Sequence, residues 1–138
     1  MNIPPLTTDN IGDLLVKIIE FTLSRQKILI ENIKDSHHSD FVPKDLAVDE
    51  FCCQLMFAIA EHIRSQRLVF CDTENIKFGA AGSFEVLPAV DECAKELLDE
   101  DEDEYFRLQI NKLLENSLNQ RIATELLRER LGMVPVFE

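Results

Sequence analysis

Residues 25–45, RQKILIENIKDSHHSDFVPKD, carry the chain from the end of a helix through a polar turn into an extended segment. The stretch keeps apolar residues at helical spacing as far as Ile33, and then changes to Asp, Ser and His, which cap or turn a helix rather than continue it. Pro43 fixes its own backbone and biases the residue before it towards an extended conformation. We therefore predict a helix that ends near Asp35, followed by a turn and strap over residues 36–45.

The segment before this turn is expected to form one long helix over residues 9–35. Good N-cap residue types precede it, and Asp13 places an acidic charge near its positive end. Its apolar residues occupy more than one helical face: Ile11, Leu14, Leu15, Ile18, Ile19, Phe21, Leu23, Ile28, Leu29, Ile30 and Ile33. We expect this helix to be buried on a wide arc or to contact two neighbours.

A second long helix is predicted over residues 103–131. Its apolar residues recur every three or four positions: Phe106, Ile110, Leu113, Leu114, Leu118, Ile122, Leu126, Leu127 and Leu131. Gly132, with Pro135 beyond it, suits the position after a helix end. Two long amphipathic helices most simply pack as an antiparallel pair. Asn32 and Asn116 then lie within or beside the apolar seams, where an amide fixes register, or they are surface residues.

The middle of the chain is expected to be mixed in structure. We predict a helix over residues 46–67, two or three short strands within 68–88, and a short helix over 89–98. The small-residue loop 79–83 lacks the Gly-Lys-Ser/Thr ending of a phosphate loop and is expected to be a hairpin tip. The acidic run 99–104 lacks the turn-forming glycine of a cation loop and is expected to be a solvated helix start.

Length and composition suit one mainly helical domain spanning residues 1–138, in which the terminal helices pack as an antiparallel pair beside a middle helix and a small β-hairpin region. The net charge of −12 argues against binding to nucleic acid or anionic lipid, so neutral or basic protein partners are expected. The first residues lack the features of a secretory signal, and no apolar run is long enough to span a membrane.

The four cysteines show no C-x-x-C spacing, which is unlike most zinc sites. They are Cys52, Cys53, Cys71 and Cys93, and we predict that they are small buried residues in a reducing compartment. The alternative is a disulfide or metal site assisted by His37, His38 or His62. No nucleophile–base pair or ligand spacing supports an enzyme, so no catalytic residue, metal or cofactor is expected, and His62 is interpreted as a helix-terminal charge or packed ring.

The 25–45 stretch resembles the N-terminal signature of bacterial flagellar basal-body rod proteins, especially the proximal-rod FlgB type. The matching positions, in register without a gap, are Arg25, Gln26, Leu29, Asn32, Ile33, Phe41, Lys44, Asp45 and Leu46. The chain departs from that family at two places. Residues 34–36 replace its usual Ala-Asn-Ala, and residues 38–40 replace its Thr-Pro-Gly, so the turn here is expected to differ in shape.

The C-terminal helix carries the second part of this resemblance. Residues 113–118, LLENSL, then 123–127, ATELL, and then 131–133, LGM, are similar to the closing pattern of the family. Gln120 stands where an aromatic residue is usual in that family. The resemblance therefore covers both ends of the chain and leaves its middle unmatched.

The resemblance implies a non-enzymatic subunit of the flagellar rod that is exported by the flagellar apparatus without a cleaved signal peptide and resides in the basal body. Its partners would be other rod or basal-body proteins, or further copies of itself. The residues that it implies for subunit contacts are Arg25, Gln26, Leu29, Asn32, Ile33, Phe41, Asp45, Leu114, Asn116, Leu118, Leu126, Leu127 and Met133. The alternative is a cytoplasmic helical interaction module, descended from rod proteins but not assembled into a flagellum.

Overall fold

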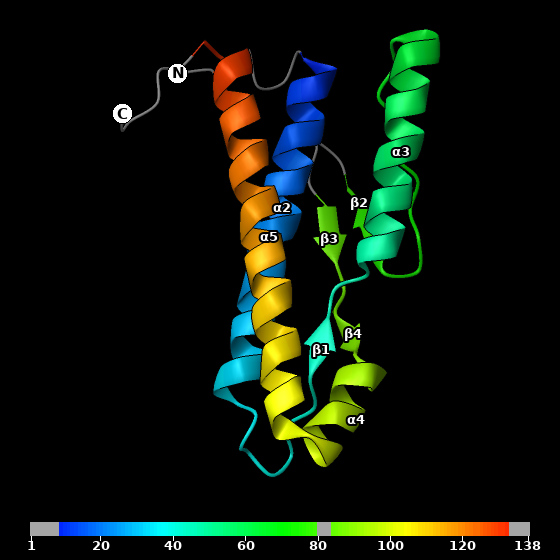
Figure 1. Ribbon diagram of the computed structural model, residues 1–138. Helices are drawn as coiled ribbons and strands as arrows, with labels where there is room; N and C mark the ends of the chain where they lie inside the picture. The colour runs from blue at the N-terminus through cyan, green and yellow to red at the C-terminus, as the bar shows by residue number, and fades with distance from the viewer. Residues whose placement is uncertain (1–8, 80–83, 133–138) are drawn as a thin grey trace.

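The computed structural model describes residues 9–79 and 84–132, and it is mainly helical (Figure 1). The two long helices, α2 (Asn10–Lys34) and α5 (Glu102–Arg130), lie side by side along the molecule, as predicted. The other elements are β1 (Lys44–Asp45), α3 (Val48–Ser65), β2 (Ile76–Phe78), β3 (Phe84–Val86), β4 (Ala89–Val90) and α4 (Glu92–Glu100). The predicted fold class, with a middle helix and a small β-hairpin region, is confirmed.

Polar contacts along the helix pair show that α2 and α5 are antiparallel. Near one end, Arg130 Nε lies 2.6 Å from Asp9 Oδ2. In the middle, Asn116 donates to the backbone oxygen of Thr22 at 2.8 Å. Towards the other end, α5 is hydrogen-bonded to Asn32. Residue numbers therefore rise along one helix as they fall along the other.

The ends of both long helices follow from their capping residues. Asp9 accepts a hydrogen bond from the amide of Ile11 at the start of α2, and Asp101 accepts one from the amide of Glu104 at the start of α5. After α5, Gly132 has a φ of +71°, a conformation that glycine adopts without a side-chain clash. The predicted ranges 9–35 and 103–131 agree closely with these bounds.

The hydrophobic core joins α2 to the middle of the chain. Its buried members are Phe21, Leu46, Phe51 and Ile76, and the rings of Phe21 and Phe51 stack with centroids 4.1 Å apart. Ring contacts continue from Phe51 into the hairpin of β2 and β3, which lies between α2 and α3 (Figure 1). α2 therefore contacts α5 on one side and the core on another, so the prediction of two neighbours is confirmed.

Two small antiparallel ribbons complete the fold. In the first, β2 pairs with β3 so that Ile76 faces Val86. In the second, β1 pairs with β4 so that Lys44 faces Val90, which fixes the strap beside the chain that leads into α4. Residues 68–71 form no strand, and residues 89–90, expected to begin the short helix, form β4 instead because their backbone pairs with the strap. The expected hairpin tip at 79–83 lies largely outside the described residues.

Candidate interaction surfaces

Four charged side chains form an ionic cluster where the strap crosses the helix pair. Arg25 of α2 donates to both carboxylate oxygens of Asp45, at 2.8 and 2.9 Å. Lys112 of α5 lies 3.0 Å from Asp45 and 2.6 Å from Asp91, the residue that caps α4. The cluster of Arg25, Asp45, Asp91 and Lys112 therefore links α2, β1, α5 and the start of α4.

The cluster stabilises the charged forms of Asp45 and Lys112. Burial raises the pKa of Asp45, but hydrogen bonds and charge from Arg25 and Lys112 outweigh that effect and hold the pKa below its usual value. Burial likewise lowers the pKa of Lys112, but hydrogen bonds to Asp91 and Asp45 outweigh it and leave the pKa above its usual value. The partners of Asp45 and Lys112 thus offset the cost of burying these two charges.

A polar cluster of Asn32, Tyr105 and Gln109 lies next to the ionic cluster. The Asn32 side chain donates to the backbone oxygen of Lys44 at 2.7 Å and accepts from its amide at 3.1 Å. It also donates to Gln109 Oε1 at 3.0 Å, and the Tyr105 hydroxyl donates to the backbone oxygen of Asn32 at 2.6 Å. Asn32 therefore acts as a bridge between the strap and α5, and Asn116 makes a comparable contact to Thr22. Both asparagines are buried, so they lie within the packed structure and are not surface residues.

Removing the hydroxyl of Tyr105 should change how stability depends on alkaline pH. Burial raises the pKa of Tyr105 to about 12. Because this folded-state value exceeds the usual value of 10.0, the stabilisation is complete below pH 10 and is lost as the pH rises towards 12. Tyr105→Phe should lose about 1–2 kcal/mol of unfolding free energy at neutral pH, since the oxygen of Asn32 loses its donor.

Urea unfolding of both proteins at neutral pH and across the alkaline range measures this effect. The variant should lose less stability than the wild type between pH 10 and pH 12, because only the wild type has a tyrosine that must ionise here. Lys112 is present in both proteins, so its contribution to the loss of stability at alkaline pH is the same in each. Parallel pH profiles for the two proteins would contradict the prediction.

The residues predicted to make subunit contacts fall into three groups. Those buried within the chain are Arg25, Leu29, Asn32 and Asn116; those half-buried are Gln26, Ile33, Phe41, Asp45 and Leu127. Those exposed are Leu114, Leu118 and Leu126, and Met133 lies outside the described residues. The first group fixes the helix pair and strap within one chain, whereas the third is accessible to a partner. Their role in subunit contacts stays a prediction.

The face of α5 that contacts α2 differs from the predicted apolar stripe. Tyr105, Gln109 and Asn116 face α2, and two of them donate to backbone oxygens of that helix. An aliphatic side chain could not supply those hydrogen bonds, so polar residues occupy the seam. The predicted antiparallel pair is therefore held at these points by polar residues of α5 and not by its apolar stripe.

Much of that stripe is exposed instead and forms a continuous ridge along α5. Its members are Ile110, Leu114, Leu118, Ile122 and Leu126, each four residues after the last. Leu114 is 65% exposed and Leu118 is 57% exposed. Rows of residues at four-residue spacing are the ridges that fit into the grooves of neighbouring helices. This α5 ridge is an exposed apolar surface and a candidate contact surface.

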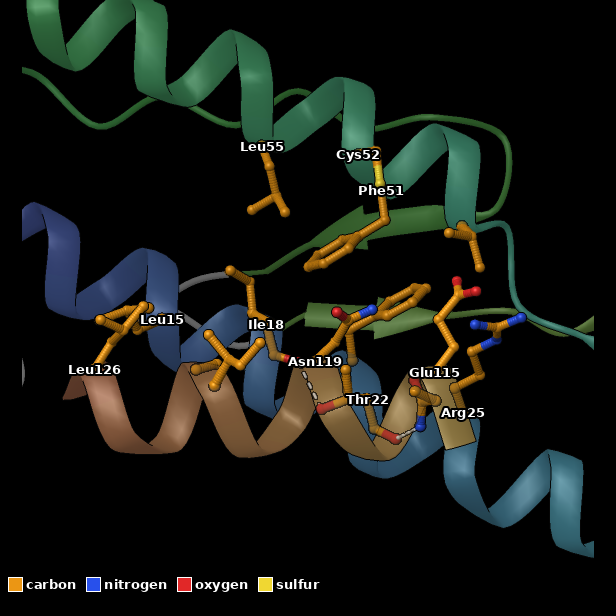
Figure 2. Close-up of a pocket in the computed structure, with 15 residues that line it drawn as sticks. Leu15, Ile18, Thr22, Arg25, Phe51, Cys52, Leu55, Glu115, Asn119 and Leu126 are labelled. Carbon is orange, nitrogen blue, oxygen red and sulfur yellow. Dashed lines mark hydrogen bonds between the residues drawn. The ribbon is translucent and has the colours of Figure 1, made fainter. Parts of the chain in front are cut away.

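A groove of about 280 Å³ lies between α3 and the α2–α5 pair (Figure 2). At one end Leu55 points from α3 towards Leu15 and Leu126, which come from the two long helices. At the other end Arg25 and Glu115 make the lining polar. The apolar end of the groove adjoins the last members of the α5 ridge, so the two surfaces are continuous.

The prediction that the four cysteines are buried is wrong, because all four are exposed. Cys52 and Cys53 are on α3, where the buried positions are taken by Phe51 and Ala58. His62 Nδ1 lies 3.1 Å from the side-chain amide of Asn10, so its ring is held against the start of α2. Across residues 9–79 and 84–132, no three His, Cys, Asp or Glu side chains lie close enough together to hold a metal ion.

The acidic run 99–104 is fully exposed, as predicted, and Asp101 within it separates α4 from α5. The described part of the chain contains no helix with both the length and the apolarity required to cross a bilayer. Several residues of the two clusters were missed by sequence reasoning: Asp91, Tyr105, Gln109 and Lys112. One available signal was the seven-residue interval between Gln109 and Asn116, which places two amides on one face of α5.

Comparison with known proteins identifies no relative of this chain. No protein-family model matches the chain, and no curated protein or solved structure matches it. Function must therefore be inferred from the surfaces themselves and from the residues that carry the rod resemblance.

Proposed function

We propose that this protein is a non-enzymatic subunit of the bacterial flagellar rod that assembles with other basal-body proteins, or with itself, through its paired terminal helices. The observation that carries the proposal is the exposed α5 ridge, which has apolar side chains along a long helix where solvent alone would favour polar residues. The part of the resemblance that lies on α5 includes Leu114, Leu118 and Leu126 of this ridge.

The buried residues of the resemblance support the same proposal in a different way. Arg25, Asn32 and Asp45 hold the strap against α2, and Asn116 holds α5 in register with it. A subunit that stacks through two helices needs those helices to keep a fixed spacing and register. These contacts supply that rigidity and leave the ridge free for neighbouring subunits.

The proposal is tested by deleting the gene and scoring swimming together with basal bodies in electron micrographs. We expect the deletion strain to lack rods and filaments, and the wild-type gene to restore them. Normal motility without the gene, in a strain with no second rod protein of this type, would reject the rod role. It would favour the helical interaction module outside the flagellum.

A ridge variant should separate assembly from folding. Leu114→Asp together with Leu118→Asp should fail to restore rods, because charged residues in an apolar contact are costly to desolvate. Ser117→Asp is a matched control, since Ser117 is exposed on the same helix but lies outside the ridge. Both proteins should show the circular dichroism and melting behaviour of the wild type. Restoration of rods by the ridge variant would rule out this surface as the contact.

A further inference from the structure

A second apolar face, on α3, lies outside the terminal helices. Cys52, Met56, Ile59 and Ile63 are exposed, and Met56 and Ile63 are the most accessible, at 70% and 72%. Their intervals are four, three and four residues, the spacing of a coiled-coil seam. We call these four residues the α3 seam. α3 buries Phe51 and Ala58 on a neighbouring face, so the seam is not needed for the core.

The spacing of the α3 seam is the same when it is read in either direction. If two copies of α3 lie antiparallel, Cys52 of one copy faces Ile63 of the other, and Met56 faces Ile59. Every seam residue then contacts another apolar residue across a two-fold axis. Such a contact is self-complementary, which is the requirement for a closed symmetric dimer.

The residues that flank the seam indicate what kind of partner fits. Flanking positions of a coiled coil normally carry the charges that select a partner. Here they are Cys53 and Ala60 on one side and Leu55 and His62 on the other, so no Asp, Glu, Lys or Arg is present among them. A basic partner helix would find no acidic flank, and a second copy would meet no repulsion between like charges.

The residues just beyond the seam favour the antiparallel arrangement. Asp49 is next in the same register, three positions before Cys52. A parallel pair would place the two Asp49 carboxylates against each other, which is unfavourable. The antiparallel pair places Asp49 opposite Gln66 instead.

We propose that the α3 seam binds the α3 seam of a second copy of this chain, forming an antiparallel two-fold dimer. Cys52 and Leu55 also line the groove beside α3, so the helix of the partner covers the mouth of this groove and contacts its apolar lining. The dimer uses residues outside the rod resemblance and does not depend on the proposed rod function.

Sedimentation equilibrium of the full chain over a wide concentration range tests dimerisation. We expect a concentration-dependent dimer, and Met56→Glu together with Ile63→Glu should weaken it by at least about tenfold, because charges would enter the apolar contact. Leu23→Glu together with Ile30→Glu, an equally drastic change at two exposed apolar residues of α2 outside both surfaces, should leave the dimer unchanged. A wild-type chain that stays monomeric, or a dimer lost only with the α2 change, would overturn the proposal.

Disulfide trapping tests the orientation. In a chain with Cys53, Cys71 and Cys93 replaced by serine, Ile63→Cys should form an intermolecular bond with Cys52 of the second copy on mild oxidation. Two controls should stay uncrosslinked: the same chain with Ile63 retained, and the Ile63→Cys chain with Cys52→Ser. Crosslinking in either control would overturn the antiparallel arrangement, because a parallel pair brings identical positions together.

Discussion

Replacing Asp45 with alanine is expected to lower the free energy of unfolding by about 3–5 kcal/mol. The change leaves Arg25, whose side chain is 8% exposed, without its carboxylate partner, and it leaves Lys112 with Asp91 alone. An uncompensated buried charge costs more than the ion pair itself contributes. Urea unfolding at neutral pH, followed by circular dichroism, measures the loss.

The acidic side of the pH profile gives a second readout of the same variant. The pKa of Asp45 is lower in the folded chain than its usual value of 3.8. The stabilisation is therefore present above about pH 4 and is lost as the pH falls through the folded value. Asp45→Ala should consequently remove part of the acid sensitivity of the wild type.

Glu125→Ala provides the control for Asp45→Ala. Glu125 pairs with Arg128 one turn away at 3.3 Å, and both side chains are substantially exposed. An exposed pair of this kind contributes at most about 1 kcal/mol. If the Asp45 and Glu125 variants lost similar amounts of stability, the ionic cluster would not be what holds the strap to the helix pair.

Replacing Asn32 with alanine is the second change with a large expected effect, at least about 3 kcal/mol. The side chain of Asn32 satisfies the backbone amide and oxygen of Lys44 and the side-chain oxygen of Gln109. All three groups would lose their partner, and Gln109 already has a buried nitrogen without a hydrogen bond. Amide hydrogen exchange should show faster exchange at Lys44 than in the wild type.

Asn119→Ala is the matched control for Asn32→Ala. Asn119 is on α5, where its side chain is exposed beside the groove. Its removal should change the unfolding free energy by no more than about 0.5 kcal/mol. A loss comparable to that of Asn32→Ala would contradict the prediction, because it would show that the effect does not come from the bridge between Asn32 and the strap.

The sequence predicted the elements of the fold better than the faces by which they pack. Capping residues such as Asp9 and Asp101 act on the nearest amides, so local sequence is enough to locate the long helices. Apolar spacing on α5 did not indicate which of its faces contacts α2, because the seam depends on hydrogen bonds to backbone oxygens of a distant helix. That information is present only once Thr22 and Asn116 are brought together.

The strap shows the same limit at the level of the site. Pro43 and the polar turn indicated an extended segment, but its partners come from positions far away in the sequence. Asp91 and Lys112 join Asp45 only because β4 and α5 return to the strap. Exposure of the cysteines was also missed, since cysteine is usually buried and only the packing of α3 shows which of its faces is free.

The polar register of the helix pair has a mechanical consequence. Sliding α5 along α2 by one helical turn is a shift of about 5.4 Å, larger than any hydrogen bond can stretch. Such a slip would break the Asp9–Arg130, Thr22–Asn116 and Asn32–Gln109 contacts together, at separate points along the pair. An axial load on the molecule is thus shared among several hydrogen bonds and ion pairs. The pair should therefore resist shear more strongly than two helices of the same length that pack only through apolar side chains.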